Sequence, residues 1–93
     1  MTASKGTSLL LFVVSNTPRS MQAIENLRRV LGDVADRSFE LEIVNVFEDP
    51  ERALAERVLV TPTLLAPASS QRIVGDLSEL SQLRYFLQTL PAA

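Results

Sequence analysis

The chain has 93 residues, of which 46% are hydrophobic and 22% are charged, so its composition is that of one small folded domain and not of a disordered segment. Nine Lys and Arg against eleven Asp and Glu give a formal net charge of −2, which excludes the basic surface that attracts nucleic acid or an anionic membrane. The sequence contains neither Cys nor His. It therefore has no disulfide, no thiolate nucleophile and none of the commonest metal ligands, and an enzyme is disfavoured.

The N-terminal part of the chain predicts a tail and a buried strand. Residues 1–7 are mostly small and polar, and we expect them to form a flexible tail ahead of a single domain at 8–90. Residues 8–14 are almost wholly apolar, which is typical of a strand buried on both faces inside a sheet. The run is too short to span a membrane and no signal-peptide cleavage site follows it, so we expect a cytoplasmic protein with no membrane partner.

An amphipathic helix is predicted after this strand. Asn16 or Thr17 can cap it, Pro18 suits its first position, and Gly32 suits its end. The apolar residues that should face the core recur at steps of three and four, at Met21, Ile24, Leu27, Val30 and Leu31.

Residues 39–47 begin with strict alternation of apolar and charged side chains, which predicts a strand at the edge of the sheet. Glu40 and Glu42 on its polar face would discourage pairing with another sheet edge. Strand, helix and strand in this order predict a right-handed parallel unit.

The next segment predicts a short helix and a hairpin. Asp49 and Pro50 signal a helix that extends to about residue 57, with Ala53 and Leu54 turned inward. A third strand should begin near Pro62, because proline is tolerated at the start of a strand or at an edge. A turn at 66–70 then leads back into a fourth strand at 71–74.

The C-terminal segment predicts a final helix over 78–89. Gly75 ends the fourth strand, and Asp76 and Glu79 are spaced as in a capping box. The complete order is the α/β layout of thioredoxin-like proteins, βαβαββα, with an expected sheet order of 2-1-3-4. The core-facing residues of this helix are expected to be Leu80, Leu83, Phe86, Leu87 and Leu90.

Four short motifs follow one another along the chain: Ser15 to Ser20, Asn45-Val46 ahead of Asp49-Pro50, Val60 to Leu64, and Arg72 to Ser78. In this order and spacing they resemble the KaiB family of bacterial circadian-clock proteins. The resemblance extends from Leu9 to Leu90, and it is shared by the N-terminal sensor domain of the clock kinase SasA.

The resemblance implies a binding protein and not an enzyme, without cofactor or metal. Proteins of this family bind the ATPase ring of KaiC, then recruit KaiA and displace SasA. Gln22 stands where family members carry a basic residue that helps to dock KaiC. In this family the edge of the second strand and the following helix meet KaiC, which points here to Leu41, Ile43, Glu48, Asp49, Pro50, Glu51 and Arg52.

The better-known family members are metamorphic. They rest as tetramers in a ground-state fold, βαββααβ, and bind KaiC in a rarer thioredoxin-like fold. Those proteins carry Gly and Asp where this chain has Phe86 and Gln88, and both differences favour a helix. We therefore expect a monomer in the thioredoxin-like fold, with the tetrameric ground-state fold as the alternative. Gly75 and Asp76 are either a hinge between the two folds or simply a turn and a helix cap.

Three further features allow a functional and a structural interpretation. Pro62 lies where thioredoxin-like proteins keep a cis proline; the pattern alone favours trans, and both forms stay open. The turn from Asn16 to Arg19 lies where redox enzymes carry Cys-x-x-Cys, but without sulfur it cannot perform that chemistry. Ser15 or Thr17 would need a base to act as a nucleophile, and the sequence contains no His. The carboxylates lack the spacing of a metal-binding loop and suit a solvated face; they are Glu40, Glu42, Glu48, Asp49, Glu51 and Glu56.

Two other functions remain open beside KaiC binding. One is a sensor module of a SasA-type histidine kinase or of a stress-signalling system. The other is a small thioredoxin-fold enzyme or glutathione binder, which the absence of Cys and His disfavours.

Overall fold

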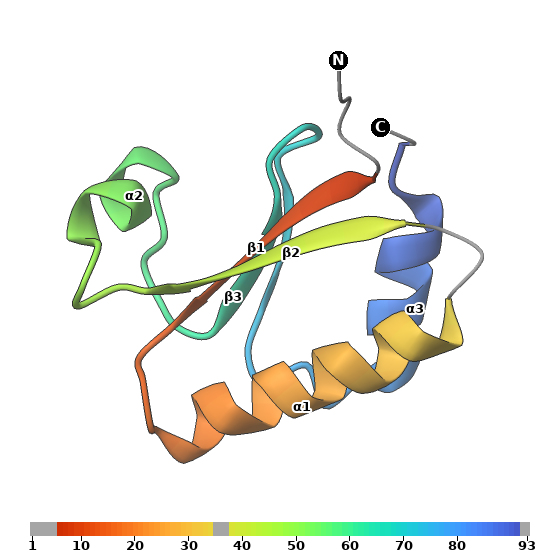
Figure 1. Ribbon diagram of the computed structural model, residues 1–93, viewed down its shortest axis with the longest axis horizontal. Helices are drawn as coiled ribbons and strands as arrows, with labels where there is room; N and C mark the ends of the chain where they lie inside the picture. The colour runs from red at the N-terminus through yellow and green to blue at the C-terminus, as the bar shows by residue number, and fades with distance from the viewer. Residues whose placement is uncertain (1–5, 35–37, 92–93) are drawn as a thin grey trace.

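The structure is a computed structural model that describes residues 6–34 and 38–91 (Figure 1). The expected order of strands and helices is confirmed, with boundaries that differ by a few residues. The elements are β1 (Thr7–Val13), α1 (Pro18–Asp33), β2 (Phe39–Asn45), α2 (Pro50–Ala55), β3 (Thr63–Ala66), β4 (Gln71–Val74) and α3 (Leu80–Thr89).

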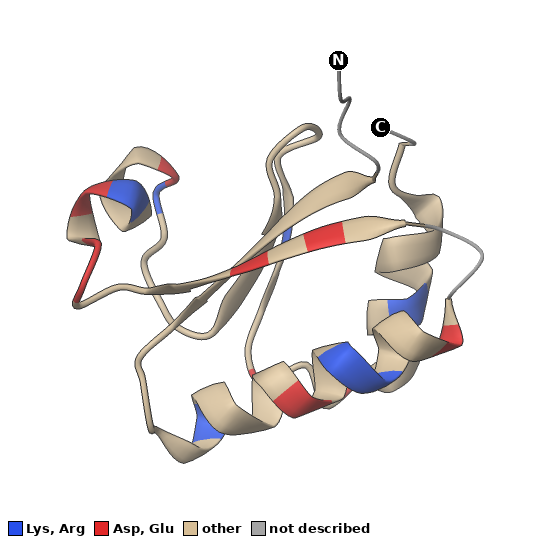
Figure 2. Cartoon of the chain, in the orientation of Figure 1, with Lys and Arg blue, Asp and Glu red and all other residues tan. Residues whose placement is uncertain are grey.

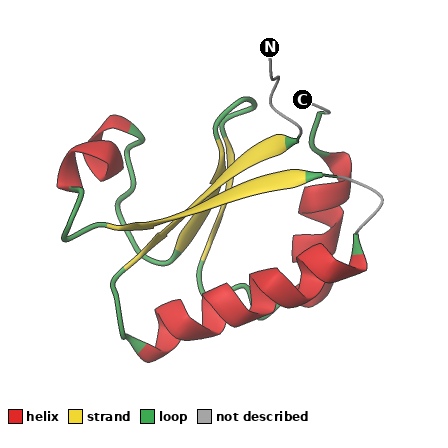
Figure 3. Ribbon diagram, in the orientation of Figure 1, coloured by secondary structure: helices red, strands yellow, loops and turns green. Residues whose placement is uncertain are grey.

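The four strands form one mixed sheet in the order β2-β1-β3-β4, as expected (Figure 3). β1 pairs in parallel with β2 and antiparallel with β3, and β3 and β4 form an antiparallel hairpin. β1 begins at Thr7, which lies in the segment assigned to the tail, and Gly6 and Thr7 are both buried. The rest of that tail, residues 1–5, lies outside the described residues.

The two faces of the sheet carry separate apolar clusters. Because side chains alternate along a strand, Leu9 and Leu11 of β1 point to one face, and Leu10 and Phe12 point to the other. The first face packs against α1 and α3 and holds the larger cluster. The second face packs against α2 alone, through Ala53. Figure 1 shows α2 well apart from the other two helices.

The inward face of α1 differs from the expected one. Met21 is exposed, and Ile24 and Leu31 are only half-buried. The helix is rotated because Ser20 is buried at its start, where the Ser20 Oγ accepts a hydrogen bond of 3.1 Å from the Val14 amide. The buried face is instead formed by Ser20, Ala23, Asn26, Leu27 and Val30.

Gly32 was expected to end α1, and this prediction is wrong. The helix runs through it to Asp33, and the capping residue is Val34, whose amide donates to the Val30 carbonyl oxygen at 3.1 Å. Val34 is buried in the larger cluster. Burial of this side chain favours continuation of the helix by one residue past the glycine, to Asp33.

Leu54 was expected to face the core, and this is also wrong. α2 has only six residues and buries Ala53, whereas Leu54 is exposed to solvent. Adjacent helical residues are separated by about 100°, so a helix that turns Ala53 toward the sheet turns Leu54 away from it.

The connection from β4 to α3 does not form the expected capping box. Helix α3 begins at Leu80 with Glu79 as its N-cap and without a side-chain capping bond. The Asp76 Oδ1 instead accepts from the Ser78 amide at 3.1 Å. Leu77 is buried with a φ of 63°, so the chain turns inward before the helix can start. Leu83, Phe86, Leu87 and Leu90 are buried as expected, and Leu80 is half-buried.

Candidate protein-binding surface

The β2 strand presents one edge of the sheet, because β1 is its neighbour on one side and the sheet ends there. Its residues alternate between the two faces. Phe39 and Leu41 pack against the larger cluster below α1 and α3, and Ile43, on the same face, is 37% exposed at the rim. Glu40 and Glu42 point to the α2 face and form the two acidic bands on β2 in Figure 2.

Asn45, the last residue of β2, organises the turn that leads into α2. Its carbonyl oxygen accepts hydrogen bonds from the Glu48 and Asp49 amides, both at 3.0 Å, and its side-chain Oδ1 accepts from the Phe47 amide at 3.0 Å. Its side-chain amide donates to the Ser15 Oγ at 2.6 Å. The turn is thereby fixed to the loop that follows β1.

An ion pair between Arg52 and Glu42 holds α2 to the edge strand. The Arg52 guanidinium donates to both carboxylate oxygens of Glu42, one of them at 2.9 Å from Nη2. This two-point hydrogen bonding lowers the pKa of Glu42 from its ordinary value and raises the pKa of Arg52. Because both side chains keep a substantial solvent-accessible surface, 37% for Arg52 and 56% for Glu42, the pair orients the helix more than it stabilises the fold.

A second arginine holds the other end of α2. Arg72, on β4, donates to the carbonyl oxygens of Glu56 at 2.8 Å and Arg57 at 3.3 Å. These carbonyl groups follow the last turn of the helix, where backbone acceptors lack helical partners. One arginine therefore joins α2 to β2 and the other joins it to β4, so this short helix has a fixed position on the sheet.

The structure divides the expected partner-binding residues into two groups. Leu41 and Ile43 lie on the face covered by α1, so they do not meet the α2 residues on a single face. Around the start of α2, Glu48, Pro50 and Glu51 are exposed, whereas Asp49 and Arg52 are half-buried. The common feature of both groups is the β2 edge, which lies between them.

The residues expected to influence the fold lie in three places. Pro62 is buried before β3, and the Thr61–Pro62 peptide bond is cis. Gly75, after β4, has a φ of 116°, a conformation that favours glycine, and Asp76 follows it. The pKa of Asp76 is lowered, first by the hydrogen bond from the Ser78 side chain. On α3, Phe86 is buried in the core and Gln88 is exposed.

The loop before α1 uses its hydroxyl groups for capping. The Thr17 Oγ1 accepts from the Ser20 amide at 3.3 Å and donates to the Val14 carbonyl at 2.9 Å.

Within residues 6–34 and 38–91, no group of three or more acidic side chains is placed to hold a metal ion. The same residues include no helix long and apolar enough to cross a membrane.

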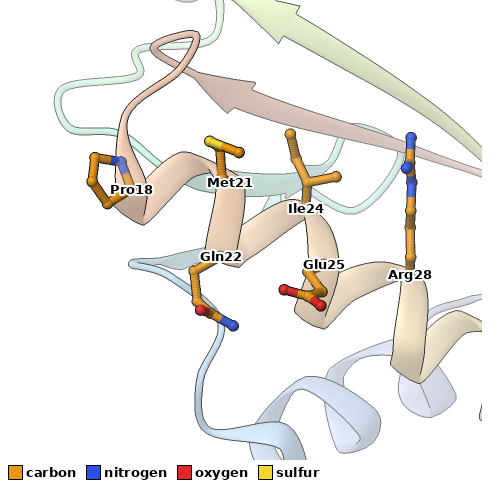
Figure 4. Close-up of a pocket in the computed structure, with 6 residues that line it drawn as sticks. All are labelled: Pro18, Met21, Gln22, Ile24, Glu25 and Arg28. Atoms are coloured by element: carbon orange, nitrogen blue, oxygen red, sulfur yellow. The ribbon is translucent and has the colours of Figure 1, made fainter.

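Two features of the surface were missed from the sequence. The first is the Arg72 contact, because a hydrogen bond from a side chain to carbonyl groups fifteen and sixteen residues away leaves no sequence pattern. The second is a shallow groove along α1 (Figure 4). Because the helix is rotated from its expected orientation, Met21 is exposed and lines this groove beside Gln22. The groove is lined by Pro18, Met21, Gln22, Ile24, Glu25 and Arg28.

A mixed four-stranded sheet with two helices on one face and a short helix on the other is the architecture of a thioredoxin-like domain. Comparison with solved structures supports this class. Oxidised mitochondrial thioredoxin 3 from Saccharomyces cerevisiae aligns with a TM-score of 0.73 at 17% identity, over 90% of this chain and 78% of that chain. Here the fold carries no cysteine pair.

The sequence matches the KaiB domain family over residues 10–89, so the chain belongs to the KaiB family. It is 38% identical to the circadian clock protein KaiB3 of Synechocystis sp., over 89% of this chain and 83% of the relative. It is 36% identical to the circadian clock oscillator protein KaiB of Prochlorococcus marinus, over 97% of this chain and 88% of the relative. The N-terminal domain of Synechococcus elongatus SasA aligns with a TM-score of 0.73 at 28% identity, over 94% of this chain and 84% of that chain. The expected family and the thioredoxin-like fold are confirmed.

Proposed function

We propose that this protein is a clock or stress-signalling module that binds a KaiC-type ATPase ring reversibly and has no chemical step of its own. The observation that carries the proposal is the family match over residues 10–89, in a chain that folds as the thioredoxin-like KaiB arrangement. Binding would act by population shift, since a partner that prefers one arrangement of the chain draws the equilibrium toward it. The proposal places the protein in the cytoplasm, with a KaiA-like protein as a further partner.

The docking surface in this proposal is the β2 edge together with the turn and helix that follow. Ile43 is exposed at the rim of this edge, and Glu48 and Glu51 are exposed beside α2. The fixed position of α2 supports the proposal, because a rigid surface loses less conformational entropy on binding than a mobile one. The proposed contact residues are Leu41, Ile43, Glu48, Asp49, Pro50, Glu51 and Arg52.

Co-elution with a KaiC-type ring, in ATP and in ADP, tests the proposal. We expect wild-type protein to co-elute in a nucleotide-dependent manner and Ile43→Asp to weaken binding at least tenfold, since a charge would enter an apolar contact. The matched control is Val74→Asp, because Val74 is an exposed apolar residue on β4, at the opposite edge of the sheet. Failure of wild type to bind, or equal loss in both variants, would refute the proposal.

We further propose that the free protein rests in the thioredoxin-like arrangement. Its support is the burial of Phe86, Leu87 and Leu90 by the C-terminal helix, because an extended strand here would place alternate residues on opposite faces. Backbone chemical shifts should report helix over 80–89 in the free chain. Helix at 58–66, or a strand within 78–89, would contradict it.

A second candidate is a sensor module of a SasA-type histidine kinase, in which no change of fold is needed. It is favoured by the alignment with the N-terminal domain of SasA over 94% of this chain. A kinase domain encoded in frame with this sequence in the natural gene would favour this candidate over the first.

A further inference from the structure

Four large apolar side chains are exposed around α2, and we name them the apolar α2 patch. Phe47 is 77% exposed, Leu54 77%, Leu59 92% and Val60 50%. They come from the turn before α2, the helix itself and the segment after it. A shallow groove lies beside them, lined by Val46, Ala53, Val58, Leu59, Val60 and Thr61.

The patch does not serve the packing of the fold. The small cluster between α2 and the sheet is made by other residues, including Ala53, Val44 and Phe12. A single exposed leucine is ordinary on a protein surface, but several large apolar residues in one short segment mark an interaction site. The four side chains are therefore exposed without contributing to the core cluster under α2, which leaves them accessible to a partner.

The charge around the patch indicates what kind of partner it fits. Residues 47–60 contain four acidic and two basic side chains, a net of −2, which equals the formal charge of the whole chain. The other 79 residues carry seven basic and seven acidic side chains and are neutral overall. Arg52 is already engaged by Glu42, and Glu48 and Glu51 are exposed beside it. Figure 2 shows acidic residues in the turn that leads into α2 and in the helix itself.

We infer that the apolar α2 patch docks a protein segment that combines apolar side chains with Lys or Arg. The acidic side chains would steer a basic segment toward the surface, and burial of apolar area would hold it. The inference rests on the proposed function, because the patch shares the turn before α2 and the helix itself with the proposed docking surface. It names the chemistry of the partner at that surface.

Titration of ¹⁵N-labelled full-length protein with designed peptides tests the inference without the ATPase. The probe is an amphipathic 14-residue peptide of Leu and Lys; the comparison peptides replace Lys by Glu, or Leu by Ser. We expect amide shifts confined to 47–60 with the Leu/Lys peptide, and at least tenfold weaker binding of the other two. Shifts centred elsewhere, such as on the α1 groove, or equal binding of the Leu/Glu peptide would overturn the inference.

Paired variants sharpen this test. Leu59→Ser should weaken binding of the Leu/Lys peptide at least tenfold and leave the native shifts of distant residues intact, because Leu59 is almost fully exposed. Tyr85→Ser, on α3, is the control, since Tyr85 is 70% exposed and lies outside the patch. Unchanged binding by Leu59→Ser would overturn the inference, as would concentration-dependent shifts at 47–60 without peptide, which would identify a second copy as the occupant.

The same variants separate this inference from the proposed function. Peptide binding at the patch without co-elution of wild type with the ATPase would leave the inference standing and refute the function. Co-elution that Leu59→Ser does not weaken, together with peptide shifts elsewhere, would refute the inference and leave the proposed function standing.

Discussion

At the scale of single residues, Asn26 shows how one buried polar side chain ties distant parts of the chain together. It lies on the inward face of α1, and its amide donates to the Asp76 carbonyl oxygen at 3.0 Å, fifty residues away. Its own Oδ1 accepts from the Gln22 side chain at 3.0 Å. The bond satisfies a carbonyl group in the connection between β4 and α3, where Leu77 has a left-handed backbone conformation.

Replacement of Asn26 by Ala should lower the free energy of unfolding by about 1–3 kcal/mol, because the Asp76 carbonyl would lose its buried donor. Urea denaturation measures the change. Gln22→Ala is the control: its side chain is exposed, so the expected cost is below about 0.5 kcal/mol. Equal effects of the two substitutions would show that the bond to Asp76 contributes nothing.

The ion pair between Glu42 and Arg52 predicts a pH dependence at the same scale. The pKa of Glu42 is lowered, so the pair is complete above the ordinary glutamate pKa of about 4.3. Its contribution disappears as the pH falls through the lower pKa of the folded state. In Arg52→Met the pKa of Glu42 should return upward, as followed by ¹³C NMR titration of its carboxylate.

Arg84→Met is the matched control for this titration. Arg84 also pairs with an exposed carboxylate, Asp33, at 2.8 Å, but on the other side of the sheet. The pKa of Glu42 should not change in this variant. A Glu42 pKa that stays low without Arg52 would contradict the assigned cause.

At the scale of elements, α3 depends more on what it buries than on its intrinsic helix propensity. It has ten residues, which is short for a helix that is stable in isolation, and it has no side-chain cap at its start. Burial of Leu83, Phe86 and Leu87 compensates for both. Phe86 is the largest of these buried side chains, so we expect its removal to weaken the helix most.

Phe86→Gly should cost at least about 3 kcal/mol, from the cavity and about 1 kcal/mol of helix propensity. Backbone shifts should then report loss of helix over 80–89. Tyr85→Gly is the control, since the same glycine enters the same helix at an exposed position and costs only about 1 kcal/mol. A Phe86→Gly variant no less stable than this control would refute the argument from burial.

Because Phe86→Gly can fail to fold, Gln88→Asp gives a milder test. Gln88 is exposed in the last turn of α3, where a negative charge opposes the helix dipole and aspartate is a poorer helix former than glutamine. We expect a loss of about 0.5 kcal/mol in urea denaturation with the fold retained. An increase in stability would contradict this prediction.

At the scale of the whole molecule, helices of the same chain pack against both faces of the sheet. α1 and α3 cover one face and α2 covers part of the other, so neither apolar cluster requires a second chain. The β2 edge carries Glu40 and Glu42, which oppose pairing between two such edges.

The protein should therefore be monomeric at micromolar concentration. Light scattering coupled to size exclusion should give a mass near 10.2 kDa. A mass about four times larger would indicate the tetrameric ground-state arrangement, and it would contradict both the monomer and the resting fold proposed above.

The sequence alone determined the order of the elements, the central place of β1, the edge position of β2, the helix at the C-terminus and the family. These follow from local apolar periodicity, from proline and glycine positions and from motif order, all of which are properties of neighbouring residues. Only the tertiary structure decided how the helices are rotated and where they end. Met21 turned outward because hydrogen bonding at Ser20 set the orientation of α1, and Leu54 turned outward because α2 packs through Ala53. Val34 extended α1 past Gly32 because its burial outweighs a local stop signal. The contacts of Arg52, Arg72 and Asn26 likewise join segments far apart in the chain, and no local pattern encodes which distant groups meet.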